Sequence, residues 1–188
     1  CCAHGGQQLA FWNAHENERG FAPMHIYHVA SGLPVVAILR AARTPKGTEV
    51  RTVISRVSQR IRVKWPVTRL VWRGDSHYGR VEAMEWAESE EADYVFGFAG
   101  NAALERHVSE TARELRFKHA RSKEAKLRCY TSFLYKAKSW KRPRTVVARI
   151  EVSLLADPKE PGKMLQEVDT RYIVTSLKGE PEHIYENV

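Results

Sequence analysis

The sequence predicts a mixed α/β fold, in which helices flank a mixed sheet and a β-rich insertion occupies the C-terminal half. Two observations indicate this class. Apolar and amphipathic segments alternate over residues 1–121 in the order strand, strand, helix, strand, helix, strand, helix, which is typical of an α/β core. Residues 122–178 then contain three successive strand-like runs and a basic hairpin. We expect residues 179–188 to begin a returning helix.

The first elements follow from turn signals and apolar runs. Residues 1–20 are rich in glycine and polar side chains, so we expect mostly loop with one short strand. Two strand-like runs, residues 21–30 and 33–41, flank Ser31-Gly32, which predicts a β-hairpin. The second run is nearly all apolar, as in a strand buried on both faces.

Helices and strands alternate in the next part of the chain. A helix is expected from Gly47 or Thr48 until Pro66 ends it, because its apolar side chains recur at helical spacing. A strand over 69–73 then leads into a turn that carries Asp75. The elements expected after the turn are a helix over 80–91, a strand over 93–99 and a polar helix over 102–119.

The C-terminal half reads as strands over 127–137, 144–155 and 168–177. The middle strand alternates cleanly, with one apolar face. That face is made of Val146, Ala148, Ile150, Val152 and Leu154. Residues 180–188 look like the start of a helix.

The charge of the chain indicates a polyanionic partner. The formal net charge is +8 and the pI is about 9.5, which favours nucleic acid first and an anionic membrane second. Hydrophobic residues make up 43% of the chain, enough for a packed core, and no apolar run reaches the length of a membrane span. The three cysteines show no zinc-binding or disulfide spacing, which favours a reducing compartment.

A basic cluster surrounds one aromatic residue in the hairpin that precedes the middle strand. Its members are Lys136, Lys138, Trp140, Lys141, Arg142 and Arg144. The cations would follow a DNA backbone, and Trp140 would stack on an unpaired base. The alternative is a hairpin tip that contacts only solvent.

The stretch RLVWRGDSHYGR, residues 69–80, carries the candidate chemistry. A serine esterase would use Ser76 as nucleophile, but it needs Asp-x-x-His near its end, where this chain has Glu182-His183. A metallophosphoesterase would need a ligand after Gly100-Asn101, where two alanines follow. A ribonuclease-H-like nuclease places a carboxylate at the end of a strand, where it helps to hold two divalent cations. Asp75 is expected in such a position.

Asp75 also has a purely structural interpretation, because an aspartate after a strand often caps a helix or forms an Asx turn. His77 and Arg80 flank it and are candidates for contact with a phosphate or the scissile strand. Their alternative is an ordinary role in the turn and at the start of the helix.

The chain resembles the DDE transposases of bacterial insertion sequences, in the group called transposase DDE domain group 1. The resemblance covers nearly the whole chain and is most specific at Arg73-Gly74-Asp75-Ser76 and in the following DYVFGFAGNA. It implies a ribonuclease-H-like fold with Asp75 as the second catalytic carboxylate, and a two-metal site for Mg²⁺ or Mn²⁺ in the complete domain.

The other two carboxylates of that family do not match this chain. The first would precede a Gly-Gln segment like residues 5–8, but Cys1 and Cys2 stand there. The third belongs to a Tyr-x-x-Arg-x-x-x-Glu motif, which Glu182 and Glu186 do not fit. The resemblance therefore implies the central part of a catalytic domain, incomplete at its start and inactive alone.

The resemblance also implies partners and a location. The complete enzyme would hydrolyse phosphodiesters at insertion-sequence ends and transfer the freed strand to target DNA. DNA is the expected partner, a homodimer is a candidate assembly, no membrane is involved, and the bacterial cytoplasm is the expected location. The rival hypotheses are a catalytically inactive DNA-binding remnant and a serine esterase that uses the Gly-Asp-Ser of residues 74–76.

Overall fold

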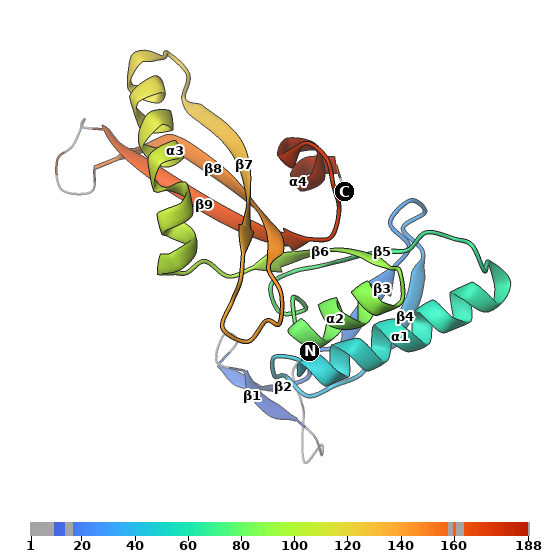
Figure 1. Ribbon diagram of the computed structural model, residues 1–188. Helices are drawn as coiled ribbons and strands as arrows, with labels where there is room; N and C mark the ends of the chain where they lie inside the picture. Colours follow the sequence, from blue (N-terminus) through green and yellow to red (C-terminus); the bar gives the residue numbers. More distant parts are fainter. Residues whose placement is uncertain (1–9, 14–16, 158–159, 161–163, 188) are drawn as a thin grey trace. The chain divides into compact units, whose positions relative to one another are not determined.

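The computed structural model describes residues 10–13, 17–157, 160 and 164–187. The chain divides into two compact units, Cys1–Pro45 and Lys46–Val188 (Figure 1). The division that the sequence suggests, at residues 121 and 178, stays a prediction.

The first unit contains two antiparallel hairpins. β1 (Phe11–Asn13) pairs with β2 (Glu18–Gly20), and β3 (Met24–Tyr27) pairs with β4 (Pro34–Ile38). The predicted turn at Ser31-Gly32 is confirmed, and Gly32 adopts a φ of 65°, a conformation that favours glycine.

The prediction that residues 33–41 form a strand buried on both faces is wrong. Leu33, Val35 and Leu39 are 64%, 44% and 70% exposed. β4 belongs to a two-stranded sheet with β3, and no other described strand pairs with it. Apolar composition alone did not distinguish such a hairpin from a central strand.

The second unit is built on a five-stranded mixed sheet. Its spatial order is β5 (Val71–Gly74), β6 (Asp93–Phe98), β9 (Met164–Thr175), β8 (Arg144–Ala156) and β7 (Lys126–Tyr135). β5 and β6 are parallel, and the other neighbours are antiparallel. This sheet confirms the predicted mixed α/β class and is compatible with a ribonuclease-H-like fold.

The strands of the C-terminal half extend the sheet that begins with β5 and β6. β9 pairs with β6 through Phe98 and Tyr172 at one end and Val95 and Thr175 at the other. β7, β8 and β9 therefore share a sheet with β5, the strand that precedes Asp75.

All four expected helices are present. They are α1 (Gly47–Lys64), α2 (Val81–Ser89), α3 (Ala102–Arg121) and α4 (Pro181–Asn187). Asn101 caps α3, because its Oδ1 accepts hydrogen bonds from the amides of Ala103 and Leu104 at 2.9 and 3.1 Å. This role leaves no support for Asn101 as a phosphoesterase ligand. None of the described helices combines the length and apolarity that crossing a membrane requires.

The core lies between the sheet and the helices α1, α2 and α3 (Figure 1). Four of the five side chains on the predicted apolar face of β8 are fully buried in it, which confirms that this face packs in the core. Leu154, the fifth, is 41% exposed near the end of the strand. Val147, on the other face, is fully buried as well. α4 packs on the opposite face, where Arg149 of β8 lies 5.5 Å from the Tyr185 ring.

Candidate functional site at Asp75

Asp75 follows the last residue of β5 and begins the turn that leads to α2. Because β5 and β6 are parallel, their carboxyl ends meet at one end of the sheet, and Asp75 lies there. Its side chain is 63% exposed. The sequence placed a carboxylate at a strand end, and the structure has it there.

The turn around Asp75 is an Asx turn. The Asp75 Oδ1 accepts a hydrogen bond from the amide of His77 at 2.8 Å, and the amide of Tyr78 donates to the Asp75 carbonyl at 3.1 Å. Within the described part of the chain, no group bonds to Oδ2. The side chain of Asp75 therefore caps the turn through Oδ1, while Oδ2 has no bond to a described residue.

Two glycines bring this turn against β6. A Cβ at Gly97 would lie 2.7 Å from the amide nitrogen of Ser76 and 3.0 Å from the carbonyl carbon of Asp75. A Cβ at Gly79 would lie 2.7 Å from the carbonyl oxygen of Gly97. Only hydrogen fits at either position, so the backbone of Asp75 rests directly on β6. Sequence reasoning did not find Gly97, although a glycine inside a strand often marks a close approach of backbones.

His77 and Arg80 flank Asp75 as the sequence suggests. His77 Nδ1 lies 3.4 Å from Asp75 Oδ1, and the His77 ring is 60% exposed. Arg80 Nε donates to the His77 carbonyl at 3.0 Å, so the side chain of Arg80 closes the turn. Contact of either residue with a phosphate stays a prediction.

The structure places Trp140 and Arg144 inside the fold rather than on a DNA-facing surface. Trp140 is 5% exposed and packs against Phe98 and Tyr135, with ring centroids 5.3 and 5.7 Å apart. The Arg144 guanidinium lies 5.0 Å from the Trp140 ring and is likewise buried. The aromatic residue within the basic cluster is therefore a core residue here.

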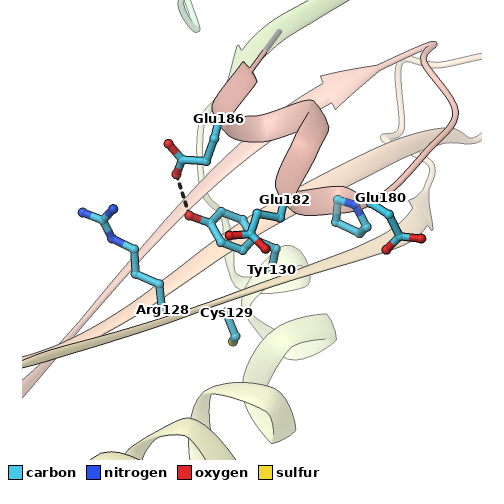
Figure 2. Close-up of a pocket in the computed structure, with 7 residues that line it drawn as sticks. Arg128, Cys129, Tyr130, Glu180, Glu182 and Glu186 are labelled. Atoms are coloured by element: carbon cyan, nitrogen blue, oxygen red, sulfur yellow. Dashed lines mark hydrogen bonds between the residues drawn. The ribbon is translucent and has the colours of Figure 1, made fainter. Parts of the chain in front are cut away.

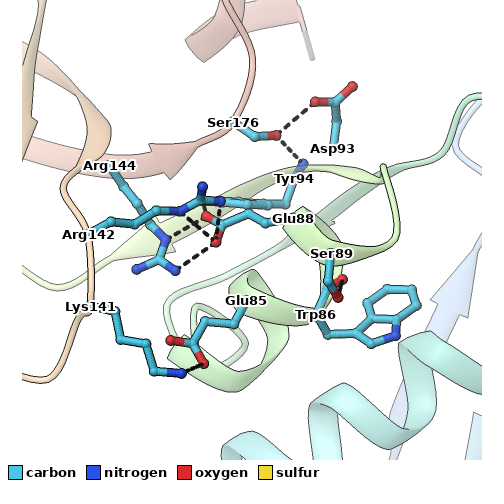
Figure 3. A network of polar contacts seen from close by, with 10 residues as sticks. All are labelled: Glu85, Trp86, Glu88, Ser89, Asp93, Tyr94, Lys141, Arg142, Arg144 and Ser176. Carbon is cyan, nitrogen blue, oxygen red and sulfur yellow. Dashed lines mark hydrogen bonds and ion pairs between the residues drawn. The ribbon is translucent and has the colours of Figure 1, made fainter.

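The remaining members of the basic cluster are exposed, but two are paired with α2. Lys141 Nζ lies 3.2 Å from Glu85 Oε2, and Arg142 Nη2 lies 2.7 Å from Glu88 Oε2 (Figure 3). Lys136 and Lys138 are exposed and make no ion pair with any described residue. These two lysines are the cations that the structure leaves available in the hairpin.

Glu88 is the centre of the network in Figure 3. Its carboxylate accepts two hydrogen bonds from Arg144, at 2.7 and 2.9 Å, and one from the Tyr94 hydroxyl at 2.8 Å. Burial raises the pKa of Glu88, but the hydrogen bonds from Arg144, Tyr94 and Arg142 together outweigh it and hold that pKa below its usual value. Glu88 therefore ties the hairpin to α2 as a carboxylate.

We expect Glu88→Gln to lower the free energy of unfolding by about 3–5 kcal/mol, because it leaves the buried Arg144 charge uncompensated. Glu85→Gln is the matched control, since it removes a more exposed pair worth about 1 kcal/mol or less. Urea unfolding followed by circular dichroism measures both. Equal losses in the two variants would show that the Glu88 network does not dominate the attachment of the hairpin.

A groove of about 460 Å³ lies between β7 and α4 (Figure 2). Its lining residues are Arg128, Cys129, Tyr130, Glu180, Pro181, Glu182 and Glu186. The Tyr130 hydroxyl donates to Glu186 Oε1 at 2.5 Å. Burial, and then this bond to Glu186, raise the pKa of Tyr130 to about 12.

Glu182 and Glu186 do not join Asp75. α4 packs on β7 and β8, whereas Asp75 follows β5 at the opposite edge of the sheet. The four strand spacings between β5 and β7 amount to about 19 Å. His183, the candidate esterase histidine, is on α4 too, so nothing in this arrangement supports Ser76 as an esterase nucleophile.

Asp75 is the one described residue that the resemblance assigns to a metal site. The described residues contain no group of three histidine, cysteine, aspartate or glutamate side chains that would hold a metal ion. Cys1, Cys2 and residues 5–8 lie outside the described residues. Asp75 has the oxygen chemistry that Mg²⁺ and Mn²⁺ prefer, but it is not by itself a complete site.

The comparisons with known proteins agree with the resemblance seen in the sequence. No curated protein matches the chain. The family model described as transposase DDE domain group 1 matches residues 1–188, the whole chain. Divalent-metal use and action on DNA are general properties of that family. The chain therefore belongs to transposase DDE domain group 1.

Proposed function

We propose that this chain is part of a transposase catalytic domain that hydrolyses phosphodiesters at insertion-sequence ends and joins the freed 3′-hydroxyl to target DNA. Asp75 is its catalytic carboxylate. The observation that carries this proposal is the position of Asp75 in a chain of this family: an exposed carboxylate at the carboxyl end of β5, seated on β6.

The residues around Asp75 would hold its carboxylate ready for a divalent ion. The amide of His77 binds Oδ1 and leaves Oδ2 without a hydrogen bond to any described residue. When bound, Mg²⁺ or Mn²⁺ activates the attacking oxygen and stabilises the leaving oxygen of a phosphodiester. Asp75 contributes one ligand to that site, and its contribution is positional and electrostatic.

His77 and Arg80 are proposed to lie beside the phosphate at the cleavage site. His77 is exposed next to Asp75, and Arg80 is bonded to the carbonyl of His77, so the two side chains leave the same turn. In the hairpin we propose that Lys136 and Lys138 contact phosphates. We propose the same for Lys141 and Arg142, which are exposed although they also pair with glutamates of α2. Such contacts with phosphates carry no sequence preference.

Metal removal tests the proposed activity. Protein expressed from the complete coding sequence is expected to nick DNA that carries the element's ends in Mg²⁺, and to lose nicking in EDTA while it still binds DNA. Nicking that survives EDTA would contradict a metal-dependent mechanism. DNA binding without nicking in either condition would instead fit the catalytically inactive DNA-binding remnant.

A further inference from the structure

One face of α1 carries a row of cations without acidic partners. Arg56, Arg60 and Lys64 follow one another at four-residue intervals, and all three are exposed. None of them makes an ion pair or a hydrogen bond through its side chain with the residues that the structure describes. The opposite face of α1 is buried through Val50, Ile54 and Val57. We call Arg56, Arg60 and Lys64 the α1 row.

The α1 row sets like charges beside one another, and within the helix itself it is Lys64, in the last turn, that gains from the helix dipole. Like charges four residues apart on a helix repel by about 0.2–0.5 kcal/mol per pair, and the row contains two such pairs. Some exposed cations elsewhere in the second unit do have acidic partners: Arg69 pairs with Asp93, and Arg113 with Glu110. The buried face of α1 does not use the row, so its charges are available to an external anion.

The α1 row extends away from the end of the sheet that carries Asp75. The start of α1 lies beside the start of α2, since a Cβ at Gly47 would fall 1.8 Å from Glu82 Oε2. Near the other end of the helices, Arg62 Nη2 donates to the Glu91 carbonyl at 3.5 Å. α1 and α2 therefore run parallel, and α2 begins directly after the Asp75 turn.

The length of the α1 row suits a DNA backbone. From Arg56 to Lys64 the helix rises about 12 Å, which corresponds to between three and four base pairs of duplex. Flexible arginine and lysine side chains on a helix surface neutralise phosphates without reading bases. A double helix is therefore a better fit than a small anion, which would need converging ligands.

We propose that the α1 row is a phosphate-binding track along which duplex DNA leaves the Asp75 end of the sheet. The direction of the DNA rests on the proposed function, whereas DNA binding by the row does not depend on catalysis. Phosphate contacts by Arg56, Arg60 and Lys64 release counterions, so they make affinity steeply dependent on salt.

The test measures the affinity of the purified 188-residue chain for a short fluorescent duplex by anisotropy over a range of salt concentrations. Arg56→Gln/Arg60→Gln is expected to make the slope of log affinity against log salt shallower by about two and to weaken binding at low salt at least about tenfold. The charge-matched control on α3 is Arg113→Gln/Arg116→Gln, which is expected to change the slope little. Circular dichroism melts check that both variants fold.

Each other outcome overturns the proposal. Equal slopes for both double variants would assign the effect to net charge alone. An unchanged slope for the α1 variant would show that the row contacts only solvent. The same variants are also tested for binding to anionic vesicles. If the α1 variant weakens vesicle binding and leaves duplex binding unchanged, the partner is a membrane surface. Asp75→Asn separates this proposal from the proposed function: it tests nicking and should leave the salt slope unchanged.

Discussion

Asp75→Asn is expected to abolish Mg²⁺-dependent nicking of transposon-end DNA by protein expressed from the complete coding sequence. The amide keeps the shape and the Oδ1 acceptor that binds the His77 amide, but it removes the negative charge that a divalent ion requires. Loss of an outer-shell partner alone costs about 10–100-fold, so a ligand should cost more than about a hundredfold. A plasmid-nicking assay measures this loss.

The control for Asp75→Asn is Asp169→Asn on β9. Asp169 pairs with Arg149 and Arg171 and lies in a strand rather than in the turn. Asp169→Asn removes the same charge as Asp75→Asn, and this variant is expected to retain nicking. DNA affinity should be unchanged in both variants. Wild-type nicking by Asp75→Asn would reduce Asp75 to a turn cap and end the transposase mechanism at this site.

Gly97→Ala is expected to displace the Asp75 turn and to lower nicking at least about tenfold. Its Cβ would meet the backbone of Ser76 at 2.7 Å, and backbone cannot rotate away as a flexible side chain can. The backbone of Gly97 does not have a positive φ, so the constraint is space rather than conformation. Overpacking of this kind costs about 1–3 kcal/mol of stability. Nicking assays and urea unfolding measure the two effects.

Gly100→Ala is the matched control for Gly97→Ala. The same methyl group at Gly100 would lie 3.4 Å from a ring carbon of Tyr172, an ordinary contact, so stability and nicking should change little. If Gly97→Ala nicks like the wild type, the turn tolerates the shift, and close packing on β6 does not position Asp75.

The helices and strands could be predicted because their signals are local. The apolar face from Val146 to Val152 and the apolar face of α1 are recognised from nearby residues alone, and the burial of each is confirmed. Whether residues far away in the chain cover a given strand leaves no such local signal in the sequence. The apolar composition of residues 33–41 predicted a covered strand, yet β4 has β3 as its single partner in the sheet.

The basic cluster shows why a charge pattern did not predict exposure. Around Trp140 every charged residue of the hairpin is a lysine or an arginine, which suggested a DNA-binding surface. Glu88, 56 residues from Arg144 in the chain, neutralises that arginine inside the fold. A contact over such a separation depends on how α2 and β8 pack, which local composition does not encode.

At the candidate site, the sequence by itself determined the residue type and its local setting. Strand, turn and helix around Asp75 follow from the pattern of residues 69–91, and membership of the family agrees with the motif. Only the tertiary structure decided what holds the turn. Parallel pairing of β5 with β6 brings Gly97 under Asp75, and a contact between two backbones leaves no trace in sequence beyond a missing side chain.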